Sequence, residues 1–196
     1  MKRSLRFPLG HSVVRSSGSW AAVAAARPFR VKRSLFDLRG LLRSDALVSL
    51  FAGGPMLIVR LTLADYHHFH FPASGAAGPA RPIPGRYDAG GPYARRRLVP
   101  FFAENCRMVT RLVSDRFGLI GMVEIGALVV GSIRQCYAPD ARVERGQEKG
   151  CFALGGSTVV LLFQPGAIDL DAKLLEMSRR GIETAVRVGE AIGRHS

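Results

Sequence analysis

The sequence is poor in several features, and each scarcity excludes a class of protein. It has three cysteines in 196 residues, none of them in a CxxC pair, so neither a disulfide framework nor a cysteine-only zinc site is expected. Its best apolar runs, 118–130 and 157–163, are interrupted by Glu124 or far shorter than the roughly 18 residues that a membrane-spanning helix needs. Aromatic residues make up 8% and do not interleave with basic ones, which argues against a nucleic-acid-binding protein.

Acidic residues are scarce as well. Only 15 Asp and Glu stand against 28 Lys and Arg, so the formal net charge is +13. Such a protein favours an anionic partner, but charge alone does not choose among nucleic acid, an anionic lipid surface and an acidic substrate. The length and the 47% hydrophobic content predict one folded domain with a core of its own.

The first residues differ in composition from the rest of the chain. The first 36 contain eight Lys and Arg and no acid, among many Ser and Ala, which is typical of an organelle transit peptide. The alternative is a divergent or truncated basic N-terminal segment. We therefore divide the chain into this segment, 1–28, and a core, 29–196.

Apolar spacing predicts the elements of the core. Apolar residues at i+3 and i+4 over 34–51 predict one amphipathic helix, with Ser34 as N-cap and Gly53-Gly54-Pro55 as its end. A second helix is expected over 170–179, capped by Asp169. Runs rich in Val, Ile and Leu, most of them bounded by Gly, Pro or Asp, predict strands at 56–63, 107–113, 119–123, 127–133 and 158–163, with an alternating strand at 182–188. The Gly- and Pro-rich segment 73–97 reads as a long irregular connection. The expected fold is α+β, predominantly β, in a single compact domain with a few short helices.

The first chemical cluster follows directly on a predicted strand. Asp65-Tyr66-His67-His68-Phe69-His70 contains three of the five histidines, and histidine supplies general acids, general bases or metal ligands near neutral pH. If the strand continues, His68 and His70 share a face, whereas a tight turn would pair His67 with His70. The HExxH pattern of zinc peptidases is absent, and no metal site is expected.

The second cluster is Gly155-Gly156-Ser157-Thr158, at the mouth of a predicted buried strand. Two glycines before a hydroxyl residue allow an unusual backbone conformation, although a simple tight turn would give the same pattern. The segment is neither the GxSxG motif of serine hydrolases nor a phosphate-binding P-loop, because no Lys follows the glycines.

Taken together and in order, these segments resemble the phosphatidylserine decarboxylase family of self-processing pyruvoyl enzymes. The first match is RLTLADYHHFHFP, close to the family pattern DYHRFH, and another is EKGCFALGGSTVVLLF. The resemblance covers roughly residues 29–193, and its segments are 60–72, 83–85, 102–107, 126–133, 148–163 and 182–193.

The resemblance implies a cleavage and then a reaction. In this family the Ser of the GST motif attacks the preceding carbonyl, so the cut bond here would be Gly156–Ser157. The β chain would end at Gly156, and the α chain would begin with a pyruvoyl group made from Ser157. That group forms a Schiff base with the amine of phosphatidylserine, carbon dioxide leaves, and phosphatidylethanolamine is released. His70 matches the base that activates Ser157, His67 matches the histidine linked to decarboxylation, and His68 stands where the family usually has Arg.

The chain also departs from the family pattern. The Asp of the family's Asp-His-Ser triad should fall near residues 9–14, but the chain has no acid before Asp37. Self-cleavage is therefore expected to be slow or absent unless another group substitutes. Cys106 replaces the family Glu, and Arg43 replaces a usual Gly.

The expected partners are phosphatidylserine, an anionic membrane surface bound peripherally, and the chain's own two cleavage products; nucleic acid is not expected. Ser157 should open a strand, close to His70 and away from bulk water. The lipid head group needs cationic or backbone N–H partners, with Arg60, 95–97 and Arg107 as candidates. The alternative function is that of a non-processing, basic lipid-binding relative. The sequence leaves open homo-oligomerisation and whether the membrane is mitochondrial, an endomembrane or a bacterial inner membrane.

Overall fold

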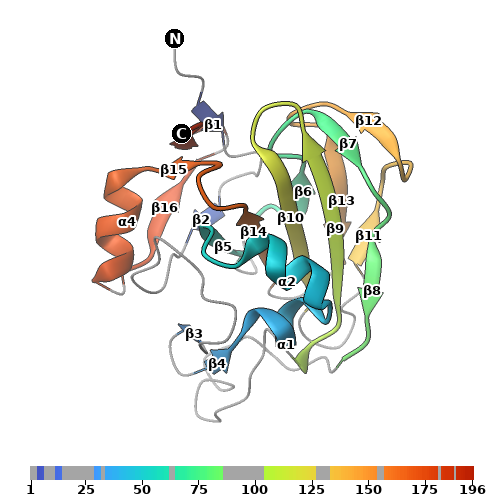
Figure 1. Ribbon diagram of the computed structural model, residues 1–196, viewed down its shortest axis with the longest axis horizontal. Coiled ribbons are helices and arrows are strands. Elements are labelled where there is room, and N and C mark those ends of the chain that lie inside the picture. Colours follow the sequence, from blue (N-terminus) through green and yellow to red (C-terminus); the bar gives the residue numbers. More distant parts are fainter. Residues whose placement is uncertain are drawn as a thin grey trace.

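A computed structural model describes ten segments of the chain: 4–6, 12–14, 29–31, 34–61, 65–85, 104–126, 133–153, 157–180, 182–187 and 189–196. Every strand pair in these segments is antiparallel. Strands dominate, and the helices are short (Figure 1). The expected α+β class, predominantly β and in a single compact domain, is confirmed.

A nine-stranded sheet forms the centre of the described structure. Its order is β12-β7-β9-β10-β14-β5-β2-β16, with β8 pairing beside β9. The bounds are β2 (Ser12–Val14), β5 (Met56–Leu61), β7 (Gly75–Ala77), β8 (Arg81–Ile83), β9 (Arg107–Ser114), β10 (Gly118–Ile125), β12 (Ala141–Val143), β14 (Ser157–Phe163) and β16 (Thr184–Val186).

Smaller elements surround this sheet. A three-stranded sheet has the order β11-β13-β6, a second has the order β1-β17-β15, and β3 pairs with β4. Their bounds are β11 (Ile133–Gln135), β13 (Glu148–Phe152), β6 (His68–His70), β1 (Ser4–Arg6), β17 (Ala191–Arg194), β15 (Asp169–Leu170), β3 (Phe29–Val31) and β4 (Ser34–Phe36). The helices are α1 (Leu38–Leu42), α2 (Asp45–Phe51) and α4 (Ala172–Arg179).

The central strands are buried on both faces, which explains why they are continuously apolar rather than alternating. In β14, Val160 and Leu162 pack with α1 and α2 on one face (Figure 1). Val159 and Leu161 belong to a second hydrophobic core on the opposite face, which includes Phe69 of the β11-β13-β6 sheet. β14 is therefore shielded from water on both sides.

The helix expected over 34–51 is wrong as a single element. Residues 34–36 form β4, and the helical part divides at Arg43, whose φ of 43° and ψ of 46° are left-handed. Asp37, not Ser34, caps α1 by accepting from the Gly40 amide at 2.6 Å. Ser44 caps α2, which ends at Phe51 before the expected glycine stop. The apolar spacing spans both helices, so it did not reveal the break.

Other expectations are confirmed or corrected in part. Strands overlap each of the predicted runs 56–63, 107–113, 119–123, 158–163 and 182–188, and β9, β10 and β14 extend one or two residues beyond theirs. Of the predicted strand 127–133, only residue 133 lies inside the described residues. The second helix begins at Ala172 with Asp171 as its cap, because Asp169 belongs to β15. The predicted irregular segment 73–97 contains β7 and β8, and its residues from 86 lie outside the described part.

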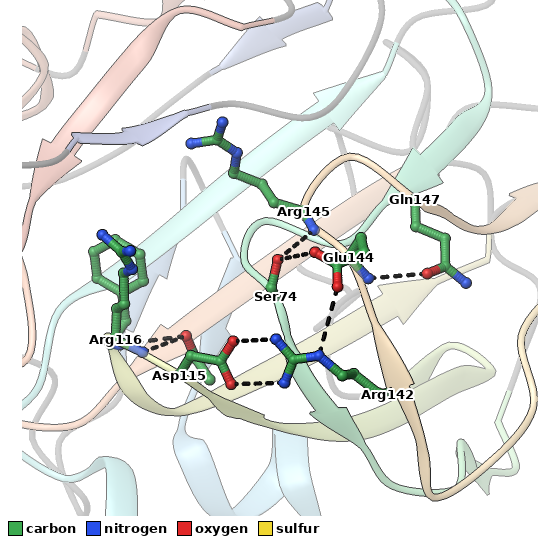
Figure 2. A network of polar contacts seen from close by, with 9 residues as sticks. Ser74, Asp115, Arg116, Arg142, Glu144, Arg145 and Gln147 are labelled. Atoms are coloured by element: carbon green, nitrogen blue, oxygen red, sulfur yellow. Dashed lines mark hydrogen bonds and ion pairs between the residues drawn. The ribbon is translucent and has the colours of Figure 1, made fainter.

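A polar network ties the turn before β13 to the β9–β10 hairpin (Figure 2). Arg142 donates two hydrogen bonds to the Asp115 carboxylate, at 3.2 and 2.7 Å, and lies 3.5 Å from Glu144. Ser74 donates to Glu144 at 2.7 Å and accepts from the Arg145 amide at 2.9 Å. The Arg142 guanidinium holds the pKa of Asp115 below its ordinary value. These groups are exposed, so we expect the network to contribute little to overall stability.

The left-handed backbone at Arg43 generates a stability prediction. An L-residue pays roughly 1–2 kcal/mol in this conformation, whereas glycine adopts it without strain. Arg43→Gly should therefore raise the free energy of unfolding by about 1 kcal/mol. Urea unfolding measures this in a Ser157→Ala background, which would also prevent the cleavage expected before Ser157. Arg39→Gly, in the interior of α1, is the control and should lower stability by about 1 kcal/mol. Destabilisation by Arg43→Gly would contradict the account.

Candidate active site

Two connections between the central sheet and the β11-β13-β6 sheet define the candidate site. One runs from the end of β5 to β6, and the other from the end of β13 to β14. Their ends are paired: Ser157 lies opposite Leu61 in the central sheet, and Cys151 lies opposite His68 in the small one. The Phe152 amide also donates to the His67 carbonyl at 2.9 Å. The histidine segment and the start of β14 are thus brought to the same junction.

Ser157 opens β14, so the expected strand start is confirmed. Residues 154–156 and the side chain of Ser157 lie outside the described part. The expected burial of the Ser157 side chain and its closeness to His70 therefore stay predictions. The neighbouring backbone is well defined, because Thr158 pairs with Arg60 on one side and Ile125 on the other.

The histidine segment is extended, which resolves the two arrangements left open by the sequence. His68 and His70 lie on one face of β6, while Phe69 is fully buried between them on the other. The Tyr66 ring stacks on both imidazoles, with centroid distances of 4.8 Å to His68 and 5.8 Å to His70. Burial and the nearby Glu148 carboxylate raise the pKa of Tyr66. Tyr66 is therefore a neutral phenol, and its ring stacks on the two imidazole rings.

His67 has a defined tautomer. Its Nδ1 lies 2.6 Å from the Asp65 carbonyl oxygen, which only accepts hydrogen bonds, so Nδ1 carries the proton. In that tautomer the lone pair of the ring is on Nε2. That nitrogen is buried and has no hydrogen-bond partner among the described residues. Nε2 is thus the atom at which this ring could exchange a proton, and the role of His67 stays a prediction.

His68 is engaged at the surface of the small sheet. Its Nδ1 lies 2.6 Å from Glu148 Oε1, and both side chains are about two-fifths exposed. The contact shows that His68 is engaged with a carboxylate of the neighbouring strand, and its exclusion from the expected catalytic set stays a prediction.

Arg107 is set aside as a head-group ligand. Its side chain is buried and donates to the backbone carbonyls of Gly40, Leu41 and Asn105. Two of these carbonyls belong to α1, so Arg107 caps the end of that helix and holds it on the sheet. Burial and the nearby Arg43 lower the pKa of Arg107 to about 10.

Of the remaining arginine candidates for binding the lipid head group, the structure describes Arg60. Arg60 lies on β5 next to Leu61, is about one-third exposed, and has Glu183 at 3.9 Å. Residues 95–97 lie outside the described part. Arg60 is therefore the one candidate that the structure places at the junction.

Cys106, which stands in place of the family Glu, joins two of the segments that carry the resemblance. Its Sγ donates to the Gly85 carbonyl at 3.0 Å and accepts from the Gly85 amide at 3.2 Å. A Cβ at Gly85 would lie 2.2 Å from the Glu104 carbonyl oxygen, so this contact requires glycine. The described part of the chain has no group of three or more His, Cys, Asp or Glu side chains that could hold a metal ion.

The sequence did not predict the buried ion pair of Lys149 and Glu124. Lys149 and Glu124 are both fully buried, and their Nζ and Oε2 atoms are 2.9 Å apart. Burial lowers the pKa of Lys149, and the Glu124 carboxylate opposes that shift. The signal in the sequence was Glu124 itself, a lone acid inside the apolar run 118–130.

The comparisons with known proteins agree with this geometry. The family model for phosphatidylserine decarboxylase matches residues 18–194. A phosphatidylserine decarboxylase proenzyme of Chlamydia muridarum is 48% identical over 166 residues, which cover 85% of this chain and 55% of that protein. The Chlamydia felis proenzyme is 45% identical over 172 residues, covering 88% and 58%, and that of Clostridium perfringens is 40% identical over 164 residues, covering 84% and 56%.

The match defines the class first: it is a decarboxylase family whose named relatives are proenzymes. The chain belongs to the phosphatidylserine decarboxylase family. It spans a little over half the length of these curated relatives.

The role assigned to Arg107 predicts a large effect on stability. Arg107→Met removes a buried cation and leaves helix carbonyls without donors, so the free energy of unfolding should fall by about 3 kcal/mol. Arg111→Met, at an exposed position on the same strand, is the matched control and should change it by at most about 0.5 kcal/mol. Urea unfolding in the Ser157→Ala background measures both. Equal effects would contradict the capping role.

Proposed function

We propose that the chain decarboxylates phosphatidylserine to phosphatidylethanolamine, using a pyruvoyl group that it makes from its own Ser157. The observation that carries the proposal is the junction, where the backbone of Ser157 begins a central strand next to the histidine segment. Family membership supports the reaction class. The pyruvoyl group would supply an electron sink for the electrons left when carbon dioxide departs.

Self-cleavage is the first chemical step. The Ser157 hydroxyl attacks the carbonyl carbon of Gly156, the C–N bond breaks, and the amide becomes an ester. Loss of the Cα proton of residue 157 then expels the Gly156 carboxylate. The enamine that remains at residue 157 becomes an imine. Water adds to its Cα, ammonia leaves, and the ketone remains. We assign the removal of the hydroxyl proton to His70.

The assignment of His67 to decarboxylation fits its tautomer. The basic Nε2 is buried and turned away from the Asp65 carbonyl that holds Nδ1. A buried ring nitrogen without a partner among the described residues, on an otherwise half-buried imidazole, is suited to moving one proton. The position of its Nε2 therefore supports His67 as the group that moves a proton at this junction.

The missing triad carboxylate affects the expected rate. Residues 12–14 form β2, which pairs with β5 at Arg60, one residue before the partner of Ser157. The segment matched to the family's Asp motif thus reaches the sheet beside the junction, but it contains no acid. This segment therefore does not supply the carboxylate that the family's triad uses, so we expect self-cleavage to be slow or absent unless another group substitutes.

Intact-mass spectrometry of the purified chain tests the function. We expect two chains divided before Ser157, with a blocked α-chain terminus. Ser157→Ala should leave one chain without activity, and Ser49→Ala, at an exposed serine of α2, should behave as the parent does. His70→Gln should block cleavage. His67→Gln should allow cleavage but lower decarboxylation by a hundredfold or more.

An uncut parent chain that still decarboxylates phosphatidylserine would overturn the mechanism. An uncut and inactive parent chain that binds lipid would instead support the alternative, a non-processing lipid-binding relative. No described residue favours that alternative over the enzyme.

We also propose that the chain acts at an anionic membrane surface as a peripheral protein. The net charge is +13, and no described helix is long and apolar enough to cross a bilayer. The β9–β10 hairpin supports surface binding, because Val113 is 60% exposed between the exposed Arg111 and Arg116.

Vesicle co-sedimentation measures this association. Binding to phosphatidylserine-containing vesicles should be strong in about 0.1 M salt and largely lost in about 1 M salt, where the screening length falls from roughly 10 to 3 Å. Neutral phosphatidylcholine vesicles are the control. Equal binding to both kinds of vesicle, or binding unaffected by salt, would exclude an electrostatic association.

A further inference from the structure

Two buried charged side chains and a partly buried glutamine connect the central sheet to the sheet that carries the histidines. Lys149 of β13 donates to Glu124 of β10 at 2.9 Å and to Gln135 of β11 at 2.7 Å. Gln135 also donates to the same Glu124 oxygen at 3.3 Å. The rings of Phe69 and Tyr137 lie 5.4 and 5.3 Å from the ammonium nitrogen. We call Glu124, Gln135 and Lys149 the inter-sheet brace.

The brace is a costly way to stabilise a core. Removing two charges from water carries a desolvation penalty that their attraction often fails to repay, and apolar side chains of similar size frequently do as well. Here one oxygen of Glu124 receives both hydrogen bonds, and the other is buried with no partner among the described residues. Stability alone therefore does not account for this arrangement, whereas fixing one register of the strands does.

Lys149 reaches the interior through an irregularity in its strand. The pairing of β13 with β6 shifts between Glu148, opposite His70, and Gly150, opposite Phe69. Lys149 is the extra residue of this bulge. A regular strand would place Lys149 on the face of Cys151, which is partly exposed, but the bulge turns it inward to Glu124. Glu148 remains on the outer face, where it contacts His68.

The bulge allows little freedom in its surroundings. A Cβ on Gly150 would lie 2.0 Å from the Arg134 carbonyl oxygen and 2.9 Å from the Phe69 ring, so the backbone there is closely packed. A slip of one residue would move the side chains of one strand to the opposite face relative to the other. The inward ammonium is the feature that distinguishes the observed register from the slipped one.

The two ends of the brace lie beside the two parts of the proposed active site. Glu124 pairs with Val159, two residues after Ser157 on the same strand. Lys149 lies between the partners of His70 and Phe69. Ser157 and His70 belong to different sheets, and the brace is a direct polar contact between those sheets next to both residues.

We propose that the inter-sheet brace positions His70 relative to Ser157, with Glu124 and Lys149 as positioning residues for self-cleavage. This inference rests on the roles proposed above for His70 and Ser157. It makes the bulge in β13 part of the processing machinery, with the brace acting through the strands that carry His70 and Ser157.

The double variant Glu124→Gln/Lys149→Met tests the brace, because it removes both charges while nearly preserving volume. Its melting temperature should stay within about 5 °C of the parent, since no buried charge is left unpaired. Its cleavage rate, followed by denaturing gel, should fall about ten- to a hundredfold, the usual effect of misplacing a catalytic group by about an ångström. In NMR spectra of the Ser157→Ala chain, the ring signals of His68 and His70 should shift or broaden when both brace substitutions are added.

The matched control is Arg142→Gln, which breaks the exposed contact with Asp115 shown in Figure 2. It should leave the cleavage rate within twofold of the parent and the histidine signals unchanged. A folded double variant with both properties of the control would overturn the brace. If the double variant does not fold, Glu124→Gln alone replaces it, and the same result would overturn the proposal.

The NMR readout separates this inference from the proposed function. A parent chain that never cleaves refutes the function, and the histidine signals then still decide whether the brace orders β6. A parent chain that cleaves, together with a double variant that cleaves equally well, leaves the function standing and refutes the brace.

Discussion

The rest of the structure depends on the hydrogen-bonded ladders that hold β14 between β5 and β10. Six residue pairs join it to each neighbour, from the Ser157 end to the Leu162 or Phe163 end. Both hydrophobic cores pack against this strand, one under α1 and α2 and the other under the histidine sheet. The strand is therefore a rigid reference to which the reactive segment and its histidines are fitted.

Two buried cations stand where the main chain of this protein departs from regular pairing. Arg107 supplies donors to backbone carbonyls at the end of α1. Lys149, at the bulge in β13, instead donates to the side chains of Glu124 and Gln135 on two other strands. Part of the net charge of +13 is thus internal and does not contribute directly to a lipid surface.

The sequence predicted the parts of the fold that depend on local composition. Strands such as β5 and β14 were recognisable because apolar residues are nearly continuous where both faces are buried. The division at Arg43 was not, since apolar spacing persists through it and its cause is one backbone conformation. The strands β7 and β8 were hidden in a Gly- and Pro-rich segment, where only pairing with β9 makes them extended.

The candidate site divides in the same way. Ser157, His67 and His70 were identified from motifs, and the strand start at Ser157 followed from its position before an apolar run. The tautomer of His67 depends on one carbonyl contact, and the shared face of His68 and His70 depends on pairing with a strand about 80 residues later. The pairing of Glu124 with Lys149 joins residues 25 positions apart and needs a bulge that no residue type predicts.

The central position of β14 has a consequence for the cleaved form. A cut before Ser157 would leave the C-terminal fragment clamped on both sides by the larger one, with β16 paired to β2 and β17 paired to β1 as well. The product would be a non-covalent complementation pair whose separation requires opening the central sheet. Refolding from denatured fragments would then be bimolecular and dependent on concentration, whereas folding of the uncut precursor is unimolecular. Cleavage would exchange a reversible fold for a kinetically trapped one.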